Sequence, residues 1–147
     1  MKNENRGFTL IELMVVMTII AVLAGFALVS LGGSRKAARD GRRKADLEQV
    51  RSALEMRRAD CGDYPSGTLV SGNTITGDDA TPGCQVCCSG TNYLTIPNDP
   101  SAGRQYVYTS TDDTTYNLCA ALEVDPPGDV TDCGTCTVAC NYKTTQP

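Results

Sequence analysis

The sequence predicts an α+β protein in which one long N-terminal helix carries a small, disulfide-rich head with an antiparallel sheet. All seven prolines and all eight cysteines of the 147 residues lie after residue 60, so the first sixty residues have the composition of an uninterrupted helix. Within them, Leu13–Ser34 is a run without any charge. In the later part of the chain, around residues 104–123, apolar and polar residues alternate, as they do in strands that bury one face.

The predicted helix runs from Phe8 to about residue 60 and has two different halves. Residues 8–34 are apolar on all sides, which requires burial in lipid or among other helices and leaves this half exposed in an isolated subunit. At ~1.5 Å per residue, the uncharged run alone is long enough to cross a hydrocarbon core of ~30 Å. Residues 35–60 continue the helix as an amphipathic half that packs on the head, because apolar side chains recur every three or four positions, at Leu47, Val50 and Leu54.

Charge divides the chain in the same place. Residues 35–58 carry nine Lys or Arg and four Asp or Glu, whereas residues 59–147 carry two and eleven. A basic segment followed by an acidic head indicates contacts between subunits. Basic and acidic residues are interleaved in the helix, so no specific nucleic-acid binding is expected. The basic residues that follow the apolar run favour a cytoplasmic head, but eight cysteines favour an oxidising compartment, and we give the cysteines more weight.

The stretch "RGFTLIELMVV" at residues 6–16 contains an isolated carboxylate. Glu12 is the only charge between Phe8 and Ser34, and a buried carboxylate is unfavourable unless it finds a counter-charge or takes up a proton. A removed secretory signal and a plain membrane anchor, with Glu12 reaching toward the lipid headgroups, are two simple explanations. The apolar run exceeds the ~7–15 residues of a secretory signal, and the carboxylate lies inside its start.

The order of a short basic leader ending in Gly7, then Phe8, then Glu12 and a long apolar stretch resembles the class III signal peptide of type IV pilins and the related pseudopilins. The resemblance implies that residues 1–7 are a leader removed by a prepilin peptidase, and that Phe8 becomes a methylated N-terminus. It also implies that Glu12 pairs with the Phe8 amine of a neighbouring subunit during filament assembly, which selects register more than it adds stability.

Residues 61–147 are predicted to form the head. Alternation predicts two antiparallel strands near 104–110 and 115–123, and this region resembles the sheet of small major pilins and the major pseudopilin. The sequence around Ser71-Gly72-Asn73 predicts a small hairpin. Some pseudopilins bind calcium in a loop after these strands, and although the glycine-rich spacing of that loop is missing here, acidic residues at roughly that place are weak calcium candidates, namely Glu123, Asp125, Asp129 and Asp132.

The cysteines are interpreted as four disulfides that stabilise a head short of large apolar residues. Because the chain contains no histidine, c-type haem attachment and mixed Cys/His zinc sites are excluded, and a four-cysteine metal site is the alternative. Connectivity does not follow from sequence, but grouping along the chain favours pairing within two sets of four. The sets are Cys61, Cys84, Cys87, Cys88 and Cys119, Cys133, Cys136, Cys140.

These observations predict a structural subunit of a type IV pilus-like filament, a homopolymer that is held in the cytoplasmic membrane before assembly and is extracellular afterwards. The prepilin peptidase and the pilus assembly machinery are the expected partners. A pseudopilin of a type II secretion system is one alternative, and a membrane-anchored binding head that never polymerises is another. No enzyme and no cofactor are expected, because the chain lacks histidine, the Gly-x-Ser-x-Gly turn and a phosphate-binding glycine loop.

Overall fold

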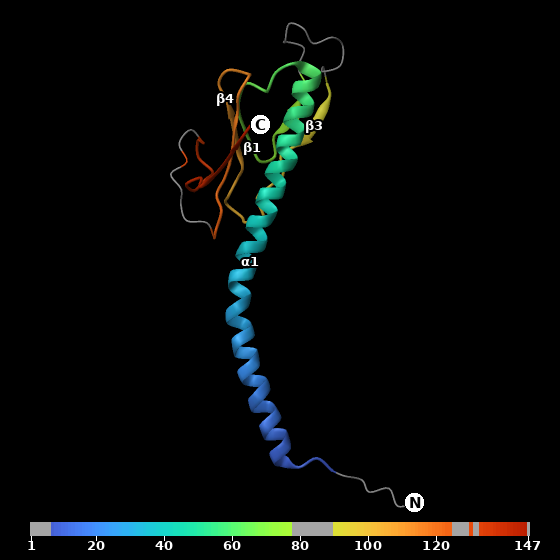
Figure 1. Cartoon of the computed structure of the whole chain (residues 1–147), viewed down its shortest axis with the longest axis vertical. Helices are drawn as coiled ribbons and strands as arrows, with labels where there is room; N and C mark the ends of the chain where they lie inside the picture. The colour runs from blue at the N-terminus through green and yellow to red at the C-terminus, as the bar shows by residue number, and fades with distance from the viewer. Residues whose placement is uncertain (1–6, 78–89, 125–129, 131–132, 147) are drawn as a thin grey trace, which may run out of the picture. The chain divides into compact units, whose positions relative to one another are not determined.

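The computed structural model describes residues 7–77, 90–124, 130 and 133–146, and of residues 29–31 it describes the backbone alone. In these parts of the chain one helix, α1 (Leu10–Cys61), is followed by short strands (Figure 1). The strands are β1 (Gly67–Val70), β2 (Thr74–Thr76), β3 (Asn92–Thr95), β4 (Val107–Ser110), β5 (Asn117–Ala120) and β6 (Tyr142–Thr145). The predicted fold class, a long N-terminal helix followed by a small antiparallel sheet, is confirmed.

The helix α1 contains 52 residues and is therefore about 78 Å long at 1.5 Å per residue. It ends where Gly62 adopts a φ of +89° and donates its N–H to the carbonyl of Arg58 at 2.8 Å. Glycine takes this left-handed conformation without the strain of a side chain, so it is a common helix terminator. The chain divides into two compact units, one ending at Lys36 and one beginning at Ala37.

The second unit contains a four-stranded sheet in the order β1-β4-β5-β6, with every neighbouring pair antiparallel. Strands β2 and β3 form a separate two-stranded sheet. In the larger sheet, Leu69, Tyr108 and Leu118 are register partners on three adjacent strands. Because successive side chains of a strand point to opposite faces, this row and the next one lie on opposite sides of the sheet.

The core of the head lies between one face of this sheet and the part of α1 that belongs to the second unit (Figure 1). Leu47, Val50 and Leu54 are at most 1% exposed and belong to one buried cluster with Tyr108 and Leu118. The apolar stripe seen in the sequence is therefore the face of the helix that packs on the sheet. At ~25 cal/mol per Å² of apolar surface removed from water, such burial is the main force that holds α1 to the head.

The hairpin expected around Ser71-Gly72-Asn73 does not form. The turn itself is present, because Asn73 donates its N–H to the carbonyl of Val70 at 2.9 Å and Gly72 has a φ of +89°. The flanking strands nevertheless enter different sheets, since β1 pairs with β4 and β2 pairs with β3. Most of β4 is buried, whereas only Ile75 of β2 is buried, so β4 offers β1 the more protected pairing partner.

Candidate functional site

The first turn of α1 holds Glu12 in a reciprocal cap. The hydroxyl oxygen of Thr9, the residue just before the helix, accepts a hydrogen bond from the Glu12 N–H at 3.3 Å. In return, the Glu12 carboxylate accepts bonds from the Thr9 N–H at 2.9 Å and from the Thr9 hydroxyl at 2.8 Å. This capping box satisfies donors that the first helical turn leaves without intrahelical partners. The charge of Glu12 is therefore bound within its own chain.

Glu12 stands on a surface that is otherwise apolar. Phe8 is 84% exposed, and large apolar side chains remain exposed along the helix as far as Leu28. By length and composition, α1 can cross a membrane, and its most apolar window has no share buried inside the protein. Exposure of such a large apolar surface to water is unfavourable. The carboxylate borders an open hollow of about 390 Å³, lined by Phe8, Ile11, Glu12, Val15 and Val16.

Sequence patterns predicted functional roles for Gly7, Phe8 and Glu12 in this region but none for Thr9. Gly7 and Phe8 are exposed, and their cleavage and methylation stay predictions. The contribution of Thr9 was readable in the sequence, because Thr-x-x-Glu before an apolar run is the signature of a capping box.

A second polar cluster lies inside the head, around the buried Arg43. Its guanidinium donates to the two carboxylate oxygens of Asp99 at 2.7 and 2.8 Å, to Asp40 at 2.6 Å and to Glu123 at 2.9 Å. Arg39 also donates to both carboxylate oxygens of Glu123. Two cations and three carboxylates thus join α1 to the loops that carry Asp99 and Glu123.

The surrounding donors favour the ionised forms of Glu123 and Asp40. Hydrogen bonding from Arg39, reinforced by Arg43, holds the pKa of Glu123 well below its ordinary value, although partial burial acts in the opposite direction. Burial also acts to raise the pKa of Asp40, but hydrogen bonds from the backbone N–H groups of Glu123 and Val124 outweigh it and lower that pKa. A buried pair in which both members remain charged is an anchor for the surrounding chain rather than an acid–base couple.

The cluster changes the interpretation of Glu123 as a calcium candidate. Its carboxylate already neutralises two guanidinium groups, which leaves little negative charge for a cation. Among the residues that the structure describes, no group of three metal-ligating side chains is placed to hold a metal ion. The other three candidates lie outside the described residues, and they are Asp125, Asp129 and Asp132.

Part of the basic segment also has an internal role, which corrects its assignment to contacts between subunits. Arg43 and Arg57 are at most 1% exposed. Arg57 donates to the carbonyl oxygen of Thr76 at 2.9 Å and to the Asp63 carboxylate at 2.7 Å. These two cations attach α1 to its own head, because a buried charge needs partners nearby. Arg42, by contrast, keeps 67% of its side chain exposed.

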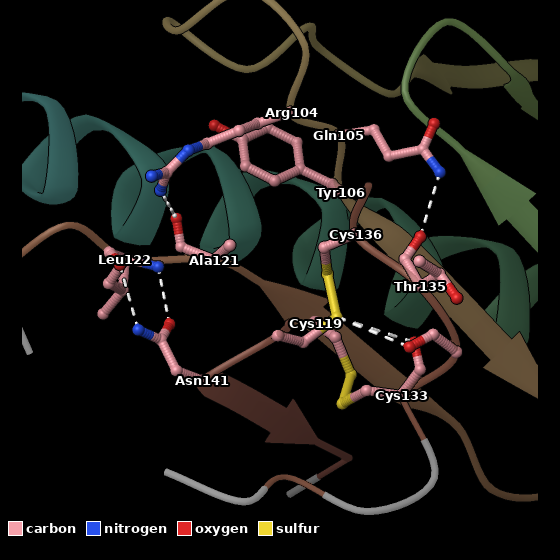
Figure 2. The surroundings of a disulfide bond; sticks show 12 residues. Arg104, Gln105, Tyr106, Cys119, Ala121, Leu122, Cys133, Thr135, Cys136 and Asn141 are labelled. Carbon is pink, nitrogen blue, oxygen red and sulfur yellow. Dashed lines mark hydrogen bonds between the residues drawn. A yellow bond between two sulfur atoms is a disulfide. The ribbon is translucent and has the colours of Figure 1, made fainter. Parts of the chain in front are cut away.

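Two disulfides close the C-terminal part of the head (Figure 2). They join Cys119 to Cys133 and Cys136 to Cys140, so both lie within the later set of four cysteines. Their buried cysteines pack with Val107 on the face of the sheet opposite the core. Figure 2 also shows how the chain beyond them is fixed, because the Asn141 side chain donates to the Leu122 carbonyl at 2.9 Å and accepts from its N–H at 2.6 Å.

Among the residues that the structure describes, Cys61 takes part in no disulfide. Its thiol is free and buried, and its sulfur lies 3.7 Å from the hydroxyl oxygen of Tyr93. That hydroxyl donates to Asp60 at 3.0 Å, so the end of α1 is attached to β3 by a tyrosine rather than by a disulfide. The other cysteines of the first set lie outside the described residues, and they are Cys84, Cys87 and Cys88.

Residues 2–28 match the family model described as a prokaryotic N-terminal methylation motif. This match covers Gly7, Phe8, Thr9 and Glu12. The chain is also similar to the type II secretion system core protein G of Klebsiella pneumoniae, with 32% identity over 98 residues that span 67% of this chain and 70% of the relative. No solved structure matches the chain.

Two further relatives are similar over shorter stretches. The type II secretion system core protein G of Escherichia coli K12 is 38% identical over 64 residues, which is 44% of each chain. A fimbrial protein of Dichelobacter nodosus is 41% identical over 81 residues, which is 52% of this chain and 51% of the relative. The chain therefore spans less than two thirds of these two relatives.

Proposed function

Because the chain belongs to the family of type IV pilins and type II secretion pseudopilins, we propose that it is a structural subunit of a surface filament built by packing of its apolar helices. The supporting observation is Glu12, a single carboxylate on a helix surface that is otherwise apolar and exposed. An apolar helix of this kind needs lipid or other helices around it. The unassembled subunit is held in the cytoplasmic membrane, and the assembled filament is extracellular.

Leader removal supplies the counter-charge that Glu12 needs in the assembled state. Hydrolysis of the Gly7–Phe8 bond by the prepilin peptidase leaves a positive α-amine on Phe8, which then receives one methyl group. This amine lies one residue before Thr9, whose N–H and hydroxyl already bind the Glu12 carboxylate. When helices of neighbouring subunits pack, the amine of one chain meets the carboxylate of the next in an environment of low dielectric constant, where attraction is strong.

The pairing selects the stagger between subunits. A carboxylate in hydrocarbon that lacks a counter-charge costs up to ~2.5–3.5 kcal/mol at the midplane and less near the membrane edge. A helix that slides by one turn leaves this cost in place, whereas the matched register removes it. Apolar contact along the rest of the helix holds the filament together without choosing a register.

Filament counts for Glu12 variants test this proposal. Glu12→Ala and Glu12→Gln, expressed at the level of the wild type, are both expected to lose most filaments in electron micrographs of cells and sheared fractions. Gln preserves the shape and the accepting oxygen but removes the charge. The matched control is Glu48→Ala, which removes an exposed glutamate from the same helix and leaves the filaments intact. Wild-type filament numbers in Glu12→Ala would instead favour a head that is anchored in the membrane and never polymerises.

A second candidate is a pseudopilin of a type II secretion system. The Klebsiella pneumoniae relative, of which the chain covers 70%, is named a core protein of that system. In this case the same helices build a short periplasmic filament, and deletion of the gene blocks export of other proteins. Shed extracellular filaments in wild-type cultures favour the pilus, and a secretion defect without shed filaments favours the pseudopilin.

A further inference from the structure

The face of the four-stranded sheet that points away from α1 changes from apolar to polar between two adjacent rows. Val70, Val107 and Cys119 are register partners in the apolar part of the first row, which the C-terminal cysteines cover and which ends at Lys143 on β6. The next row on this face contains hydroxyl and amide side chains from four adjacent strands. Because neighbouring strands are ~4.8 Å apart, these groups form a line at that spacing, and they are Thr68, Thr109, Asn117 and Thr145.

The polar row borders an open cavity of about 670 Å³, a volume within the ~300–1,000 Å³ typical of small-molecule sites. Thr68, Thr109 and Asn117 line it together with three further hydroxyl side chains, the buried Tyr116 and two glycines. None of these lining residues carries a charge. No atom lies within 4 Å of where a side chain on the lining Gly67 would begin, so the entrance on that side is open.

We propose that this cavity binds a neutral sugar in the pyranose form, such as one unit of a surface polysaccharide. A threonine hydroxyl donates one hydrogen bond and accepts two, and the Asn117 amide both donates and accepts. These groups therefore retain capacity for a ligand while bonded within the protein, and a sugar presents hydroxyls of the same dual character. A charged ligand would lose its hydration there without meeting an opposite charge among the residues that line the cavity.

The site is expected to be weak in a single subunit. The ring of Tyr116 is buried and offers no open face for stacking, so binding rests on neutral hydrogen bonds, each of which contributes modestly. The proposal does not depend on filament formation, because the cavity lies wholly in the second unit. On a fibre that repeats the head, many weak sites give a high avidity for a sugar-coated surface.

Titration of the full chain tests the site. The protein is placed in phosphocholine micelles, which carry no sugar headgroup, and its amide resonances are followed while the methyl glycosides of glucose, galactose, mannose and N-acetylglucosamine are added. We expect a saturable, millimolar response to at least one glycoside at the amides of Thr68, Thr109 and Asn117. Glucuronate, which carries a charge, is expected to produce none.

Paired variants separate the site from a general surface effect. Thr68→Val with Thr109→Val removes two cross-strand partners that line the cavity and should weaken binding about tenfold. Thr74→Val with Thr95→Val removes a cross-strand threonine pair from the other sheet and should leave binding unchanged. The proposal is overturned by the absence of a saturable response to all four glycosides, by equal affinity in both variants, or by shifts confined to another part of the head.

Discussion

Replacing Arg43 with methionine should destabilise the head by about 3–5 kcal/mol, the usual effect of removing one partner from a buried ion pair. The Arg43 side chain is 0% exposed and that of Asp99 is 1% exposed. Methionine fills most of the space of the arginine stem but donates no hydrogen bonds. Asp99 is then left without its cation in a buried place, and Asp40, whose side chain is 9% exposed, loses its bond to Arg43.

The structure sets the size of this effect. The Arg43 guanidinium makes bonds to three carboxylates and to the Ser101 hydroxyl. Counting each bond to a charged group at ~1.5–3 kcal/mol would overestimate the loss, because Arg39 still neutralises Glu123 and a stranded carboxylate can take up a proton. The remaining cost is that of roughly one uncompensated buried charge, which gives the range above.

Near-ultraviolet circular dichroism of tyrosine measures this loss selectively. All six tyrosines lie at residue 64 or later, so their signal reports unfolding of the head in the full chain, here followed in micelles with increasing urea. Arg42→Met is the matched control, because Arg42 is 67% exposed and its nitrogen lies 3.9 Å from the Asp46 carboxylate, a contact worth at most about 1 kcal/mol. Equal destabilisation by both variants would refute the reasoning.

The difference in stability between wild type and Arg43→Met should also depend on pH. Arg43 is one of the groups that lower the pKa of both Asp40 and Glu123 in the folded protein, although Arg39 has the larger effect on Glu123 and remains in the variant. The resulting stability is fully present above the unfolded pKa of about 4.3 and is lost as the pH falls below it. The difference between wild type and Arg43→Met should therefore shrink between pH 7 and pH 3, and a constant difference would contradict the assigned role.

Two other predictions concern the cap and the disulfides. Thr9→Val removes the capping hydroxyl and should weaken the first helical turn by ~1 kcal/mol, seen as about fivefold faster amide hydrogen exchange over residues 10–13. Thr9→Ser should preserve slow exchange, and identical rates in Val and Ser variants would refute the cap. Among the disulfides, replacing Cys119 and Cys133 with serine should cost ~3 kcal/mol, because the bridge spans 14 residues. The same change at Cys136 and Cys140, which spans 4 residues, should cost ~2 kcal/mol, and a reversed order would count against the loop-entropy argument.

Local patterns made the helix and the strand pair predictable. The spacing of Leu47, Val50 and Leu54 identified the buried face of α1, because helical periodicity repeats within a few residues. The alternation around Tyr108 and Leu118 likewise identified β4 and β5, which face each other in register. The Thr9 cap was equally local, and it was missed because Glu12 was considered only as an isolated charge.

Contacts between distant parts of the chain were not predictable in the same way. Arg43 meets Asp99 and Glu123 across 56 and 80 residues, and nothing in the local sequence distinguishes these acids from solvated ones. The contact between the Cys61 thiol and Tyr93 was equally unpredictable, because Tyr93 lies on β3, 32 residues away in the sequence. Which strands pair also depended on burial in the whole sheet, as the failure of the hairpin at Ser71-Gly72-Asn73 illustrates.

The claim on which the proposed function depends is that a new amine at Phe8 becomes the counter-charge of Glu12. Intact-mass and N-terminal analysis of the protein purified from its own cells tests this most directly. The account predicts a chain that begins at Phe8 and carries one methyl group on its α-nitrogen. A mature chain that still begins at Met1 would contradict it.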